Sequence, residues 1–183
     1  MPLRSRLSLI VCALAVAALG AAQPADAKTK NLWATINVCD SPKYADSVGI
    51  AARMPGDGTE RRMYMRFYVQ FREDKQWKYV KKGGVSPWLK AGSARYSWSQ
   101  RGYTFGFSPP AAGTKFVMRG LVKFEWRSKG GKVVKKTHRI TSSGHQTKGA
   151  DPEGYSAAQC TLEGPPPPPD QPPYNDPNAP PKR

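Results

Sequence analysis

The fold is decided by a predicted β-hairpin at residues 115–141, which read KFVMRGLVKFEWRSKGGKVVKKTHRIT. The first half alternates between apolar and polar side chains, as a half-buried strand requires. Its apolar positions are Phe116, Met118, Gly120, Val122, Phe124 and Trp126. The cluster Ser128-Lys129-Gly130-Gly131 then predicts a turn, and a second, strongly basic strand follows it.

Two registers of this hairpin are compatible with its glycines. A two-residue loop at Gly130-Gly131 places Trp126 opposite Lys135, whereas a three-residue loop that begins at Lys129 places it opposite Val134. A slip of one residue turns every side chain of a strand to the other face. The better match of apolar residues therefore predicts the three-residue loop.

The rest of the chain also follows the two-residue period of strands. Further strands are expected at 32–39, 48–54, 61–72, 76–81, 95–100, 103–107 and 155–162, and the change of phase at Arg101-Gly102 predicts either a bulge or a tight hairpin. No segment after residue 27 has a sustained period of 3.6 residues. The pattern predicts an all-β fold, an antiparallel β-sandwich of about seven to nine strands.

The N-terminal residues 1–27 have the pattern of a secretory signal peptide. Arg4 and Arg6 precede an apolar run, and Ala25-Asp26-Ala27 is a small-x-small cleavage site, so the cut is expected after Ala27. The alternative is an uncleaved membrane anchor, for which an alanine-rich run of this length is short. No transmembrane helix is expected in the mature chain, and the protein is predicted to be secreted.

The C-terminal residues 164–183 are rich in proline, which excludes helix and sheet and predicts a disordered, extended tail. Residues 28–163 remain as one domain. Without Arg4, Arg6 and Asp26, the 29 basic and 13 acidic side chains leave a net charge of +15. A charge of this size favours an anionic polymer or an envelope surface as the partner. Nucleic acid is possible but has no motif in its support.

Cys39 and Cys160 are the two cysteines that remain after the expected cleavage. An isolated pair in an oxidising compartment predicts one disulfide bond. Because these cysteines lie near the two ends of the domain, the bond would join its first strand to its last.

Residues 105–126, FGFSPPAAGTKFVMRGLVKFEW, resemble part of the immunoglobulin-like sandwiches, in particular the fibronectin type III domains. The resemblance covers the E strand, the E–F loop and the F strand, and it implies an immunoglobulin-like β-sandwich. Phe116 stands where those domains have a tyrosine, so a hydroxyl that bonds back to the backbone is missing. The Cys-Trp-Cys spacing of antibody domains is also absent, and the resemblance implies no functional residue.

Two surfaces are candidate binding sites. On the outward side of strand 61–72, Tyr64, Arg66 and Tyr68 lie between Arg62 and Arg72, and such a mixture can stack on sugars or bases and pair with anions. The same residue types also suit the outer face of any central strand. The second surface is the basic hairpin, which can bind a polyanion, although lysines on an edge strand also prevent aggregation. Its candidate anion-binding residues are Arg119, Lys123, Arg127, Lys129, Lys132, Lys135, Lys136 and Arg139.

No catalytic or metal-binding pattern stands out in the sequence. His138 and His145 are the only histidines, and no carboxylate lies at a regular spacing from both. In the preferred hairpin register His138 is expected on the apolar face, near Val122. We therefore predict a non-enzymatic binding or structural module without a cofactor, metal or catalytic residue. The alternative is an exported enzyme or inhibitor with its site in the loops around Trp88 or at 142–154.

Overall fold

The computed structural model describes residues 31–169, which form nine strands and no helix. The predicted signal peptide and most of the predicted disordered tail lie outside the described residues. The strands are β1 (Trp33–Ser41), β2 (Tyr44–Pro55), β3 (Arg62–Glu73), β4 (Gln76–Tyr79), β5 (Leu89–Ser93), β6 (Trp98–Gly106), β7 (Lys115–Arg127), β8 (Val133–Ile140) and β9 (Cys160–Glu163). The all-β prediction is confirmed, and the strand count lies at the upper end of the expected range.

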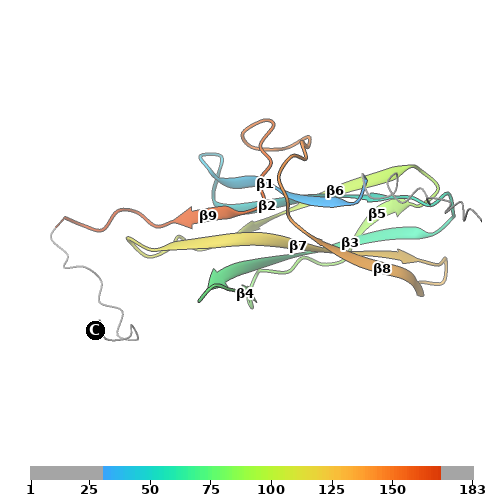
Figure 1. Cartoon of the computed structure of the whole chain (residues 1–183), viewed down its shortest axis with the longest axis horizontal. Helices are drawn as coiled ribbons and strands as arrows, with labels where there is room; N and C mark the ends of the chain where they lie inside the picture. The colour runs from blue at the N-terminus through green and yellow to red at the C-terminus, as the bar shows by residue number, and fades with distance from the viewer. Residues whose placement is uncertain (1–30, 170–183) are drawn as a thin grey trace, which may run out of the picture.

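Two antiparallel sheets form the two layers of the fold (Figure 1). The smaller sheet has the order β1-β2-β6. The larger sheet has the order β4-β3-β7-β8, with β5 paired to β3 and β9 paired to β7. Between residues 31 and 169 there is no helix long and apolar enough to cross a membrane.

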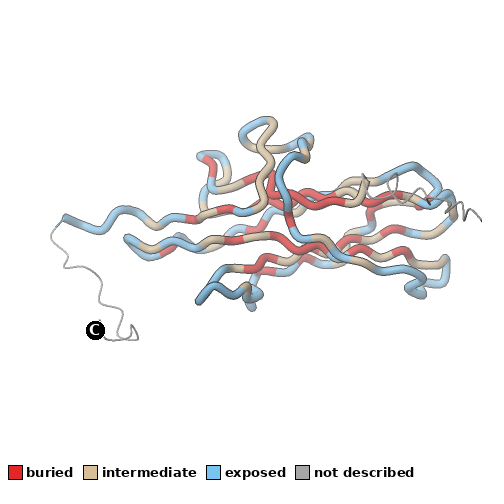
Figure 2. Tube along the Cα trace, viewed as in Figure 1, coloured by how far each residue is buried: buried red, intermediate tan, exposed pale blue. Residues whose placement is uncertain are grey.

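The core lies between the sheets, where alternate residues of facing strands meet (Figure 2). Its largest fully buried side chains include Trp126, Phe124 and Phe67 from the larger sheet, and Ile36 and Ile50 from the smaller one. The two-residue periodicity of strands 61–72 and 115–127 thus predicted the side that faces the core.

Gly120 occupies an inward-facing position of β7, and the reason for a glycine there is steric. A Cβ atom at this position would lie 2.6 Å from Cγ2 of Thr141 and 2.7 Å from Cδ1 of Ile50. The space that a side chain would fill is occupied by Ile50 from the opposite sheet. We infer that glycine at this position lets the two sheets approach.

The predicted disulfide bond is present. Cys39 in β1 and Cys160 in β9 have a Cα–Cα distance of 5.5 Å and a sequence separation of 121 residues. β1 belongs to the smaller sheet and β9 pairs with β7 of the larger one, so the bond links the two layers.

The register of the β7–β8 hairpin differs from the prediction. At the turn, the Ser128 amide donates to the Lys132 carbonyl (2.9 Å) and Arg127 pairs with Val133, as the three-residue loop requires. A register shift then follows, so that Trp126 lies opposite Lys135, which is the pairing of the two-residue loop. Val134 is the extra residue of this bulge and is exposed. β8 is an edge strand with no buried side chain, so apolar matching could not determine its register.

The two alternatives at Arg101-Gly102 are both wrong. β6 runs through these residues without interruption and pairs with β2 in one register from Ser47↔Gly106 to Pro55↔Trp98. The change of phase arises because Trp98 is on the outer face, where Arg53 lies 4.0 Å from the centre of its ring. Tyr103 and Phe105 instead belong to the inner face.

Candidate anion-binding face

The outer face of the larger sheet brings aromatic and basic side chains together. Tyr64, Arg66 and Tyr68 alternate with the buried residues of β3 and are half-buried themselves. β7 pairs with β3 over ten residues and adds basic side chains in the same rows. We call this surface the aromatic–cationic face. It consists of Tyr64, Arg66, Tyr68, Trp77, Tyr79, Trp88, Arg119, Lys123, Arg127, Lys136 and His138.

Strand register sets these side chains in rows across the sheet. Arg66 pairs with Lys123, and Lys123 pairs with His138, so one row is entirely basic. The neighbouring row contains Tyr64, Glu125 and Lys136. Because rows on one face of a sheet repeat at every second residue, aromatic and basic groups alternate along β3.

Cation–π contacts connect the rows. The Arg127 guanidinium lies 4.2 Å from the ring centre of Tyr64 and 4.9 Å from that of Trp88. The Lys123 ammonium lies 4.9 Å from the Tyr68 ring. Contacts of this kind contribute about 0.5–1 kcal/mol each at exposed sites. They hold the cations in place over the rings.

Arg66 and Arg119 are also held by hydrogen bonds. Nε of Arg66 donates to the Ser86 carbonyl (3.0 Å), and Nε of Arg119 donates to Oε1 of Gln70 (2.8 Å). Arg119 stacks on Trp77 at 4.2 Å, and its burial lowers the pKa of its guanidinium from the ordinary value. An arginine remains charged at neutral pH even so. Both guanidinium groups are therefore fixed before a ligand arrives.

A hollow of about 640 Å³ lies in this face, between Trp88 and β8. It is lined by Arg66, Tyr68, Trp88, Lys123, Phe124, Glu125, Lys136, Thr137 and His138. Glu125 is the one acid among them, and Arg127 neutralises it through Nε (2.8 Å) and Nη2 (2.7 Å). Within residues 31–169, Arg66, Lys123 and Lys136 form no ion pair, so the hollow has an excess of positive charge.

The structure joins the two predicted surfaces into one. Arg119, Lys123, Arg127 and Lys136 share the outer face with Tyr64, Arg66 and Tyr68. The other predicted cations do not: Lys129 and Lys132 lie at the turn, while Lys135 and Arg139 pair with the inward-facing Trp126 and Val122. The ammonium of Lys135 lies 4.7 Å from the centre of the Trp126 ring.

The sequence did not predict the positions of two residues of this face, His138 and Trp88. His138 was expected near Val122, but the bulge at Val134 places it opposite Lys123, where it is exposed. Trp88 was named only as a loop residue near an alternative site, but it contacts Arg66 and Arg127 on the outer face. Neither position has a local sequence signal, because both follow from strand pairing.

The loop between β8 and β9, named as an alternative site, covers the outer side of β1 (Figure 1). Hydrogen bonds join Thr35 to Ser156 (2.8 Å) and the Asn37 side chain to the Gly149 carbonyl (3.1 Å). His145 stacks on Trp33 with ring centres 4.7 Å apart. A hollow at 146–154 is lined by no histidine, cysteine or serine, and across the described residues no group of three His, Cys, Asp or Glu side chains could hold a metal ion.

His145 makes the stability of this loop sensitive to pH. Burial, followed by the charge of Arg53, lowers the pKa of His145 from its ordinary value of 6.5. The unfolded chain then binds the proton more strongly, so the free energy of unfolding falls as the pH drops below about 6.5 and through the folded-state pKa. Chemical denaturation between pH 7.5 and 5 should show this loss. His145→Gln should reduce the slope; a slope equal to that of the wild type in this variant would contradict the assignment.

A comparison of the chain with protein-family models finds no match, and a search of curated proteins finds no similar sequence.

Proposed function

We propose that the protein is an exported, non-enzymatic module that binds an anionic polymer at the cell envelope or outside the cell through its aromatic–cationic face. The observation that supports this most is the basic row Arg66, Lys123 and His138, flanked by Tyr68 and Trp88. Most cations on this face have no acidic partner among the described residues, so their charge is available to a ligand.

The extent of the face favours a polymer over a small anion. It spans β5, β3, β7 and β8, and three inter-strand spacings of about 4.8 Å give a width of about 14 Å. Several repeating anionic groups can contact cations over that width, and each contact releases counterions. Tyr64, Tyr68 and Trp88 are half-buried, and the parts of their rings that no cation covers can stack on sugar or base planes.

The strand order supports an immunoglobulin-like architecture. If β6 and β7 correspond to the E and F strands, as the resemblance implies, E pairs with the second strand and F lies between the strands that correspond to C and G. The immunoglobulin fold has these same neighbours. The disulfide bond that links β1 to β9 suits an oxidising, extracellular environment.

Removal of two cations from the basic row tests the proposed function. Arg66→Ala/Lys123→Ala should weaken binding to fluorescently labelled heparin by at least about tenfold and lower the slope of log K against log salt by about two. Lys43→Ala/Lys148→Ala is the matched control, because it removes two cations from the other side of the molecule. Affinity should be measured by fluorescence anisotropy across a salt series.

The contribution of stacking is tested separately. Arg66→Ala/Tyr68→Ala should bind heparin more weakly than Arg66→Ala alone, and the difference measures the contribution of the Tyr68 ring. The melting temperature should fall modestly, because the contacts of Arg66 with Ser86 and of Tyr68 with Lys123 are lost. A neutral dextran should not bind, and labelled DNA in parallel shows whether the face prefers a polysaccharide or a nucleic acid. A flat salt response, or equal losses in the face variant and the Lys43/Lys148 control, would contradict the proposal.

A further inference from the structure

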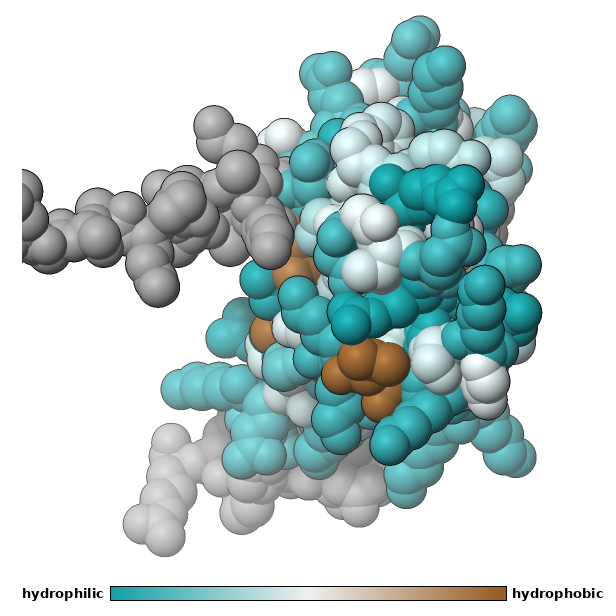
Figure 3. Space-filling view, turned by 90° about the vertical axis from the view of Figure 1, so that its right-hand side faces the viewer, coloured by the Kyte–Doolittle hydropathy of each residue, from teal (hydrophilic) through white to brown (hydrophobic). Residues whose placement is uncertain are grey.

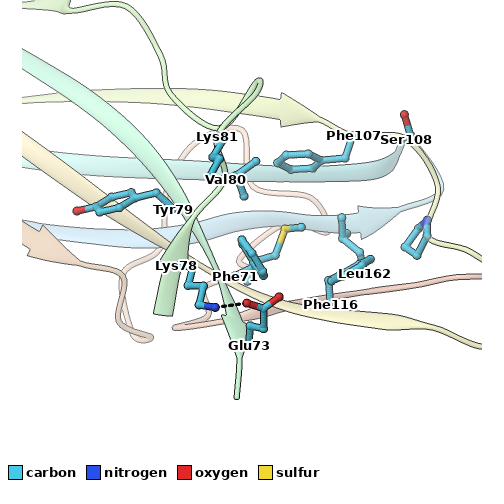
Figure 4. A pocket seen from close by; sticks show the side chains of 12 residues that line it. Phe71, Glu73, Lys78, Tyr79, Val80, Lys81, Phe107, Ser108, Phe116 and Leu162 are labelled. Atoms are coloured by element: carbon cyan, nitrogen blue, oxygen red, sulfur yellow. Dashed lines mark hydrogen bonds and ion pairs between the residues drawn. The ribbon is translucent and has the colours of Figure 1, made fainter. Parts of the chain in front are cut away.

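A further cavity lies at the end of the sandwich where the chain leaves β9, and it shares only Tyr79 with the aromatic–cationic face. Its volume is about 530 Å³, within the usual range for ligand pockets. It is lined by Phe71, Glu73, Lys78, Tyr79, Val80, Lys81, Phe107, Ser108, Pro110, Phe116, Met118 and Leu162. In Figure 4 the side chains of Phe71, Phe107, Phe116 and Leu162 surround the cavity.

The cavity exists because the two sheets are not closed at this end. Phe71 and Met118 lie on inward-facing positions of β3 and β7, and Phe116 pairs with Leu162 between β7 and β9. Phe107 enters from the opposite side, after β6. The opposite end, with the β7–β8 turn, is mainly hydrophilic (Figure 3). Phe116 is 42% exposed, although burial of its ring would be favourable.

The polar groups lie at the rim and carry a net positive charge. Lys78 forms an ion pair with Glu73, drawn as a dashed line in Figure 4. Lys81 lines the cavity, is exposed and forms no ion pair within the described part of the chain. An apolar interior with a lysine that forms no ion pair among residues 31–169 is complementary to a hydrocarbon chain that ends in an anionic group.

We propose that this cavity binds the alkyl chain of an anionic amphiphile, with Lys81 contacting the head group. The apolar walls provide the affinity, because each buried methylene contributes to transfer from water. Lys81 provides the preference for an anionic head group over a cationic one. This site is independent of the proposed polymer binding, since the two share only Tyr79.

The proposal is tested by calorimetric titration of the chain expected after cleavage, residues 28–183. The ligands are single-chain amphiphiles below their micelle concentrations. Dodecanoate should bind at one site and about tenfold more tightly than decanoate, because two methylenes are added. A short lysophosphatidylglycerol with the same chain, titrated in parallel, distinguishes a phospholipid source from a free fatty acid. Equal affinity for decanoate and dodecanoate would overturn the proposal.

Four variants locate the site. Phe116→Asp should weaken dodecanoate binding at least tenfold, whereas Tyr96→Asp, an equal charge change at a more exposed aromatic residue outside the cavity, should not. Lys81→Glu should weaken dodecanoate and strengthen dodecylammonium, while Lys82→Glu should change both much less. If Arg66→Ala/Lys123→Ala lost dodecanoate binding instead, the amphiphile would be assigned to the aromatic–cationic face and the proposed cavity site would be overturned.

The proline-rich C-terminal segment is the competing occupant, because the chain leaves β9 at this end. The Gly113 amide donates to the Pro165 carbonyl (2.8 Å), beside the loop that contributes Pro110 to the cavity. Deletion of residues 170–183 should leave dodecanoate affinity within about twofold of that of the full chain. Binding that appears only after the deletion would overturn the proposal in favour of that segment.

Discussion

Replacement of Cys39 and Cys160 by alanine is expected to lower the free energy of unfolding by about 4–5 kcal/mol. The bond closes a loop with a sequence separation of 121 residues, and a loop of this length strongly restricts the unfolded chain. Domains of this size are usually stable by only about 5–15 kcal/mol, so the loss is a large share of the total. Urea denaturation followed by tryptophan fluorescence measures it.

The matched control is the wild-type protein measured with its two cysteines kept reduced by a reducing agent, which adds no group to the buried Cys160. It should show the same loss as the double alanine variant, because both lack the covalent link. A loss below about 1 kcal/mol in both would show that the unfolded chain is already compact without the bond.

The second large effect is expected at Trp126. Its side chain is 1% exposed, and Nε1 donates to the Pro55 carbonyl (3.1 Å) across the two sheets. Trp126→Ala should lower the free energy of unfolding by about 3–5 kcal/mol through the cavity that it creates. The buried carbonyl also loses its partner, which adds to the cost.

Two further variants separate these contributions. Trp126→Phe keeps most of the apolar contact but not the hydrogen bond, so a loss of about 1–3 kcal/mol is expected. Trp98→Ala removes a tryptophan that is 43% exposed and should cost much less. Equal losses at Trp98 and Trp126 would contradict the position of Trp126 in the core.

Alternation along the chain was sufficient to predict most of the strands and the buried sides of β3 and β7, but β5 was not expected and the segments 95–100 and 103–107 belong to one strand, β6. Met63, Met65, Phe67, Val69 and Phe71 were expected in the core; the first four are fully buried, whereas Phe71 is only partly buried. The cysteine pair followed from composition and the expected compartment. These predictions depend only on local periodicity or on a count, so one sequence was enough.

The arrangement of the candidate site depends on pairings that no local pattern records. A bulge at one residue of the edge strand β8 determines whether Lys136 or Lys135 lies opposite Glu125 on the outer face. Trp88, which directly precedes β5, reaches the face only because β5 pairs with the edge of β3 that lies away from β7. The sequence therefore predicted most of the cations and two of the aromatic residues, Tyr64 and Tyr68, but it could not predict that they form one surface.

The position of the disulfide bond also determines how the domain would respond to mechanical force. If the C-terminal segment were attached to a fixed structure, tension would enter through β9 and pass across the sulfur bridge into β1. Only the residues before Cys39 and after Cys160 could then be stretched. The chain between the two cysteines could not be extended, so the strands of the aromatic–cationic face could not be pulled out of the fold along the backbone while the bond is intact.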